Sequence, residues 1–282
     1  FHTGHCPIRG NRALEFEGNV PIPKSYVTLG EVMQKAGYAT GAFGKWGQGY
    51  PGSVGDPVLR GFDQFYGYNC QREAHNYYPG HLWKNDKKVV LTGNANGKKQ
   101  QYSHDLITEQ ALSFIATPRD EPFFVYIPYT IPHTSFQVPD LENYRAKNWS
   151  ASQKTQAAMI SRMDRDVGRI IKQVQALGKL ENTLIIFSSD NGPHGAGKTL
   201  THFNAAGPLR GKKGATYEGG IRVPLIASWP GRIKSGTESD HISGFQDLLP
   251  TFAELAGAEG LANPDGISFV SELLGRPSQK KH

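Results

Sequence analysis

Apolar residues recur at two spacings along the chain, and the alternation between the two spacings predicts the fold. Over residues 151–177, apolar side chains recur every three or four positions, which predicts a long helix with one buried face. Shorter helices are predicted at 28–36, 104–115 and 247–256. Short apolar runs predict strands at 39–43, 123–129, 183–187 and 223–228. This order indicates an α/β fold, with a mostly parallel central sheet and helices on both of its faces.

One segment departs from this alternation. Residues 44–97 are rich in glycine and aromatic residues, and a short hairpin is predicted near residues 82–91. A long irregular insertion in a compact domain usually forms a functional loop, so we expect this segment to contribute to a binding site.

Composition narrows the class of partner. The 282 residues are 38% apolar, enough for one large α/β domain or two small ones. No apolar run approaches the roughly 20 residues that a membrane span needs, so we expect no membrane partner. The net charge of +6 favours an anionic partner, although a solvated basic surface is the simpler alternative. Because the lysine pairs lack interleaved aromatic residues, we expect no nucleic acid.

Polar side chains follow the predicted strands. Asp190 and Asn191 come after the strand at 183–187, and they offer hard oxygen ligands that suit Ca²⁺ or Mg²⁺. Lys45 and His133 follow two other strands, and Lys213 precedes the last strand. Ligands of open α/β sheets bind outside the carboxyl ends of the strands, so these groups could together hold a metal-bound tetrahedral anion.

Each of these residues also has a simpler interpretation. The Asp-Asn-Gly triplet could be an Asx turn, Lys45 a surface lysine, His133 a loop histidine, and Lys213 part of a basic patch. Asp164 and Asp166, on the long predicted helix, are expected to be surface or ion-pairing groups rather than metal ligands.

Four motifs in a fixed order resemble the type I sulfatase family, the arylsulfatase A-like members of the alkaline phosphatase superfamily. They are Gly44-Lys45-Trp46, Pro132-His133, Ser189-Asp190-Asn191-Gly192 and the long motif at 209–224. The resemblance implies a sulfuric ester hydrolase in which Asp190 and Asn191 bind Ca²⁺, with Mg²⁺ less expected. It also implies that Lys45 and Lys213 hold the sulfate and that His133 assists the departing alcohol.

The resemblance further implies a formylglycine nucleophile, made from a Cys/Ser-x-Pro-x-Arg motif. Cys6-Pro7-Ile8-Arg9 places its proline one residue too early, so we expect the nucleophile upstream of Phe1. Many sulfatases carry a histidine where this chain has Gly47, and His75 or His194 could contact the substrate instead. Cys6 and Cys70 could pair, or both could be free.

The resemblance also implies a domain organisation. Residues 1–275 would form a catalytic α/β domain incomplete at both ends, and residues 276–282 would begin a linker to a C-terminal subdomain. We expect a periplasmic or secreted protein whose partner is a sulfated small molecule or sulfated glycan. Without the nucleophile, we expect these 282 residues to be inactive. A phosphoesterase or phosphonate hydrolase of the same superfamily, or a noncatalytic anion- or glycan-binding protein, is the alternative.

Overall fold

The computed structural model describes residues 2, 21–258, 264–277 and 279–282. The chain divides into two compact units, one of residues 1–130 with 236–282 and the other of residues 131–235. We call them unit 1 and unit 2. No helix in the described part of the chain is both long enough and apolar enough to cross a membrane.

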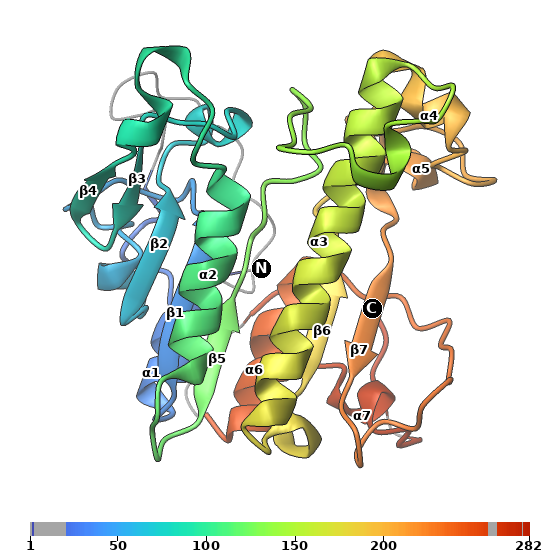
Figure 1. The fold of residues 1–282 in the computed structure, drawn as a ribbon. Helices are drawn as coiled ribbons and strands as arrows, with labels where there is room; N and C mark the ends of the chain where they lie inside the picture. Colours follow the sequence, from blue (N-terminus) through green and yellow to red (C-terminus); the bar gives the residue numbers. More distant parts are fainter. Residues whose placement is uncertain (1, 3–20, 259–263, 278) are drawn as a thin grey trace. The chain divides into compact units, whose positions relative to one another are not determined.

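Unit 1 contains a five-stranded mixed sheet in the order β4-β3-β2-β1-β5. Strand β1 (Ala39–Lys45) runs parallel to β2 (Gln64–Tyr68) and to β5 (Phe123–Tyr126). Strands β3 (His81–Lys84) and β4 (Lys87–Val90) form an antiparallel hairpin at one edge (Figure 1). The hairpin predicted near residues 82–91 is therefore confirmed.

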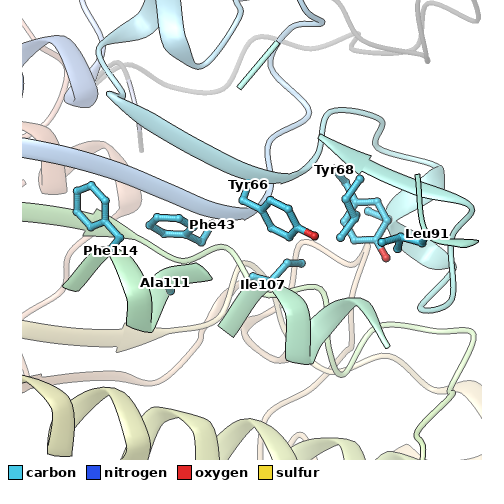
Figure 2. Packing of buried hydrophobic residues seen from close by; sticks show 9 residues of the cluster. Phe43, Tyr66, Tyr68, Leu91, Ile107, Ala111 and Phe114 are labelled. Carbon is cyan, nitrogen blue, oxygen red and sulfur yellow. The ribbon is translucent and has the colours of Figure 1, made fainter. Parts of the chain in front are cut away.

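Helices cover both faces of this sheet. Helix α2 (Ser103–Ala116) packs on the face that carries Phe43, in a cluster of buried apolar residues shown in Figure 2. Helices α1 (Leu29–Lys35) and α6 (Leu248–Ala256) pack together against Phe124 on the other face, and a short helix α7 (Val270–Leu273) follows. Because successive side chains of a strand point to opposite faces, Phe123 and Phe124 join different clusters.

Unit 2 is built around helix α3 (Ala151–Ala176), close to the predicted limits. The side chain of Ser150 caps its first turn through a capping box with Gln153. Asp166 is buried and its Oδ1 lies 3.2 Å from Arg169 Nη1, whereas Asp164 is exposed. The expectation that these two aspartates are surface or ion-pairing groups therefore agrees with their positions.

The last strand differs from its prediction. Strand β7 (Leu225–Ser228) pairs antiparallel with β6 (Ile185–Ser188), and Leu225 and Ile226 are 41% and 59% exposed. The apolar run at 223–228 also predicts that this strand is buried and belongs to the mostly parallel sheet, and both predictions are wrong for β7. An apolar run of this length indicates a strand, but it contains no information about the direction of its neighbour.

Short helical segments complete both units. Two single-turn α-helices of unit 2 are α4 (Thr199–His202) and α5 (Glu218–Ile221). The 3-10 helices of the described residues are η2 (Val58–Arg60), η3 (Glu73–His75), η4 (Thr92–Gly97), η5 (Glu142–Tyr144), η6 (Leu180–Asn182), η7 (Ala196–Lys198) and η8 (Phe245–Asp247).

Candidate functional site

In unit 1, Lys45 is the last residue of β1 and is half-buried. It pairs with Tyr68 of β2, and its backbone N–H donates to the carbonyl oxygen of Pro128 at 2.9 Å. The next residue, Trp46, is buried and donates its indole N–H to Gly55 O at 2.8 Å. The backbone of Lys45 is therefore held by β2 on one side and by Pro128, which follows β5, on the other.

Gly47 stands where the resemblance would place a histidine, and the structure gives a reason for glycine. Its φ is +67°, a backbone conformation that side chains with a Cβ rarely adopt. A Cβ atom built there would lie 2.4 Å from Gln71 Oε1, so the Gln71 amide occupies the space of a side chain.

His75 lies in η3, which follows β2 closely in the sequence, and it is half-buried. Two buried tyrosines hold the segment around it. Tyr68 Oη donates to Asn76 O at 2.6 Å, and Tyr77 Oη donates to Thr130 O at 3.1 Å. Burial raises the pKa of both phenols, so they remain neutral donors at physiological pH.

In unit 2, Asp190 and Asn191 follow the end of β6 at Ser188. Asp190 is exposed and Asn191 is half-buried. The Asn191 Nδ2 donates to Gly192 O at 3.0 Å, and this bond fixes the plane of the amide. The adjacent carboxylate and carboxamide therefore supply oxygen atoms of the type that Ca²⁺ and Mg²⁺ prefer.

Two backbone hydrogen bonds join this pair of residues to the loop that carries Lys213. Gly192 N donates to Gly220 O at 3.0 Å, and Lys213 N donates to Pro193 O at 3.0 Å. A Cβ atom at Gly192 would lie 2.0 Å from Gly219 O, so the two loops approach more closely than a side chain permits. These contacts join the backbone that follows Asp190 and Asn191 to the loop of Lys213, which comes more than twenty residues later in the sequence.

The two histidines predicted in unit 2 differ in their surroundings. His133 is half-buried and its Nδ1 is hydrogen-bonded to Thr134 O. Because a carbonyl oxygen only accepts, Nδ1 must carry a proton. His194 is exposed and its Nδ1 accepts from Ala196 N at 3.2 Å, so in the neutral ring its proton is on Nε2.

The part of the chain that the structure describes shows no metal centre made of protein carboxylates and histidines alone. Among the described residues, no three His, Cys, Asp or Glu side chains gather as potential ligands. Ca²⁺ binds six to eight oxygen atoms, so Asp190 and Asn191 fit the ion as part of a ligand set. Lys45 and His75 belong to unit 1, whereas the other predicted site residues belong to unit 2.

Unlike Cys6-Pro7-Ile8-Arg9, one segment of unit 2 matches the nucleophile pattern. Ser228-Trp229-Pro230-Gly231-Arg232 fits Ser-x-Pro-x-Arg, and Ser228 is the last residue of β7. It pairs with Ile185, the first residue of β6, whereas Asp190 follows the other end of β6. Three strand residues span about 10 Å, which is too far for Ser228 to attack an anion held beside Asp190. The register of the two strands therefore excludes Ser228 as the nucleophile.

The structure describes one of the two cysteines. Cys70 is buried with a free thiol, and its Sγ accepts from Glu73 N at 3.4 Å. Cys6, with the motif that it begins, lies outside the described residues.

Comparisons with known proteins add independent information. The family model described as Sulfatase matches residues 3–258. Arylsulfatase G of Rattus norvegicus is 32% identical over 99% of this chain and 59% of its own length. Arylsulfatase A of Homo sapiens is 31% identical over 97% of this chain and 57% of its own length. The chain thus spans about three fifths of the length of these curated relatives.

A solved structure has the same fold as this chain. The crystal structure of Ps i-CgsB in complex with k-i-k-neocarrahexaose is 30% identical and superposes with a TM-score of 0.85. The match covers 99% of this chain and 66% of that chain. The α/β fold with a mixed, largely parallel sheet is therefore confirmed.

Proposed function

The chain belongs to the sulfatase family, and we propose that this protein hydrolyses sulfuric esters of an aryl or sugar alcohol. One observation supports the proposal most strongly. The backbone bonds from Gly192 to Gly220 and from Lys213 to Pro193 join the segment that follows Asp190 and Asn191 to the loop that carries Lys213. An oxygen-ligated cation and an ammonium group suit the anionic sulfate group of such an ester.

The predicted site residues have the following roles in this proposal. Asp190 and Asn191 would hold Ca²⁺, which the family typically uses together with formylglycine. When bound, the ion supplies Lewis-acid polarisation of the sulfate, and formylglycine supplies the nucleophile. The ammonium groups of Lys45 and Lys213 neutralise sulfate oxygens, and this effect grows as negative charge develops during cleavage.

His133 is proposed as the acid that protonates the departing oxygen. Its Nδ1 proton is engaged with Thr134 O, so the proton that is transferred is the one on Nε2 of the protonated ring. His75 and His194 are proposed as substrate contacts on unit 1 and unit 2. A periplasmic or secreted location is likewise part of the proposal, and fractionation of cells that produce the protein tests it.

A kinetic comparison tests the proposal. The whole protein, co-produced with a formylglycine-generating enzyme, is assayed with 4-nitrophenyl sulfate and 4-nitrophenyl phosphate. We expect Lys213→Ala to lower kcat/KM for the sulfate by about 100-fold to 1,000-fold, the usual loss when one group that stabilises developing charge is removed. The neighbouring exposed Lys212 provides the control, because Lys212→Ala removes the same charge.

Other outcomes would change the assignment. Faster turnover of the phosphate would indicate a phosphoesterase or phosphonate hydrolase, and absence of turnover with both esters would indicate a noncatalytic anion-binding protein. An equal effect of the two lysine variants would remove Lys213 from the site. We expect negligible turnover by the 282 residues alone, and robust turnover that Cys6→Ala abolishes would make Cys6 the nucleophile.

A further inference from the structure

The carboxyl ends of β1 and β2 place a further polar side chain close to the backbone of Lys45. The two strands run parallel and Lys45 pairs with Tyr68, so both strands end at the same edge of the sheet. The chain then turns at residues 71–72, and the Gln71 side chain lies against Gly47. Gly47 is two residues beyond Lys45, which separates their Cα atoms by at most about 7 Å.

The backbone against which this amide lies is held on both sides. Before Gly47, Trp46 N donates to Tyr68 O at 2.9 Å, and the Trp46 side chain is buried. After it, Gln48 O accepts a backbone hydrogen bond of 2.9 Å. Gly47 itself is buried. The Gln71 amide therefore lies on a part of the backbone that neighbouring residues fix in place.

The amide faces Gly47 with its oxygen. A Cβ atom at Gly47 would lie 2.4 Å from Gln71 Oε1 and 3.3 Å from Gln71 Cδ. Gln71 is exposed, and the structure gives its amide no hydrogen bond to another described residue. The nitrogen of a carboxamide carries two N–H donors. Both donors of Gln71 are therefore available to a ligand.

Packing against Gly47 does not by itself explain a glutamine. The φ of +67° favours glycine at position 47, and a side chain from the neighbouring turn fills the space beside it. An apolar side chain of similar length would fill that space equally well. The carboxamide adds two hydrogen-bond donors that the packing does not use.

We propose that Gln71 is a substrate-binding residue whose Nε2 donates a hydrogen bond to the sulfate group of the ester. This inference rests on the proposed function, in which Lys45 neutralises a sulfate oxygen. Ligands of such sheets bind outside the carboxyl ends of parallel strands, which is the edge where β1 and β2 end. An ammonium group supplies charge, whereas an amide N–H supplies direction, because a hydrogen bond weakens when it is misaligned. Gln71 thereby orients the sulfate.

A binding experiment with matched variants tests the inference. The whole protein is produced without formylglycine, so that 4-nitrophenyl sulfate is bound but not hydrolysed, and calorimetry in the presence of Ca²⁺ measures its Kd. Gln71→Ala removes the donors and should raise the Kd about tenfold, as expected for one hydrogen bond to a charged group. Gln71→Glu keeps the shape of the side chain but turns a like charge toward the sulfate, and it should raise the Kd about 100-fold.

Gln100 provides the charge-matched control, because it is an exposed glutamine elsewhere in unit 1. Gln100→Glu adds the same charge as Gln71→Glu, and it should change the Kd by less than about twofold, since salt screens exposed charges. Equal effects of Gln71→Glu and Gln100→Glu would show an effect of net charge alone and would overturn the inference.

The order of the two Gln71 variants separates binding from packing. Packing alone predicts that Gln71→Ala is more harmful than the isosteric Gln71→Glu, and that result would overturn the inference. Two Gln71 variants that bind as the parent does, or a parent that binds no sulfate ester, would overturn it as well. Binding that Gln71→Ala weakens, in a protein that shows no turnover once formylglycine is installed, would support the inference and refute the proposed hydrolysis. The two failures therefore give different results.

Discussion

The strand ends that carry Lys45 and Asp190 are stabilised in different ways. In unit 1, residues 40–44 of β1 are buried, with a strand on each side and apolar clusters on both faces. In unit 2, every residue of β6 is half-buried, and backbone hydrogen bonds between glycine-rich loops hold the residues that follow it. The position of Lys45 therefore depends on side-chain packing, whereas the position of Lys213 relative to Asp190 depends on the absence of side chains at glycines.

The largest expected effect concerns the loop contact of unit 2. Gly192→Ala places a Cβ atom where Gly219 O lies 2.0 Å away, so the loops must separate. We expect a loss of about 2–4 kcal/mol in the free energy of unfolding, from overpacking and from backbone hydrogen bonds that break. Urea denaturation measures this loss, and sulfate binding should weaken with it.

Gly168 in helix α3 provides the matched control. A Cβ atom there meets nothing within 4 Å, and alanine favours the helix more than glycine does. Gly168→Ala should therefore stabilise the protein by about 0.5–1 kcal/mol. A neutral Gly192→Ala would show that packing at glycines does not hold these loops together.

The second effect concerns the packed aromatic residues of unit 1. His2 is buried, with its ring centre 4.8 Å from those of Trp46 and Tyr126, and burial lowers its pKa from 6.5 to about 3. Above pH 6.5 the ring is neutral in both the folded and the unfolded chain, so His2 does not reduce the free energy of unfolding. As the pH falls below 6.5, only the unfolded chain takes up the proton on His2, and the free energy of unfolding decreases.

The expected loss from His2 is about 2 kcal/mol between pH 6.5 and pH 5. It is measured as the difference between the protein and His2→Phe, which keeps an aromatic ring but cannot titrate. Urea denaturation at pH 8, 6.5 and 5 gives the two pH profiles. If the profiles are parallel, His2 is not held neutral by its surroundings.

The smallest effect compares helix caps of the two units. Thr28 caps α1 and Ser150 caps α3, both through capping boxes. Thr28 is fully buried and its Oγ1 also donates to Arg60 O at 2.8 Å, whereas Ser150 is exposed. We expect Thr28→Ala to cost about 1–2 kcal/mol and Ser150→Ala about 0.5–1 kcal/mol, measured by thermal unfolding. Equal costs would mean that burial adds nothing to the cap in unit 1.

The local elements were predictable because their causes lie close together in the sequence. The apolar period of α3, the Ser150 cap and the β3–β4 hairpin each depend on residues within a few positions of one another. The direction of β7 was not predictable, because its partner β6 is about forty residues away in the sequence. An apolar run does not indicate whether a strand pairs parallel or antiparallel with its neighbour. For the same reason, the sequence could not predict where Ser228 lies relative to Asp190. Only the register of β6 and β7 excludes Ser228 from the site.

For the candidate site, the sequence by itself determined the kinds of atoms available and the family to which they belong. Asp190, Asn191, Lys213, His133 and Lys45 were identified because oxygen ligands and cations follow strands in motifs of fixed order. Only the tertiary structure decided which of them meet. The contact between the loops at Gly192 and Gly220 depends on two backbones approaching without side chains, and a linear sequence does not state which glycine faces which carbonyl oxygen.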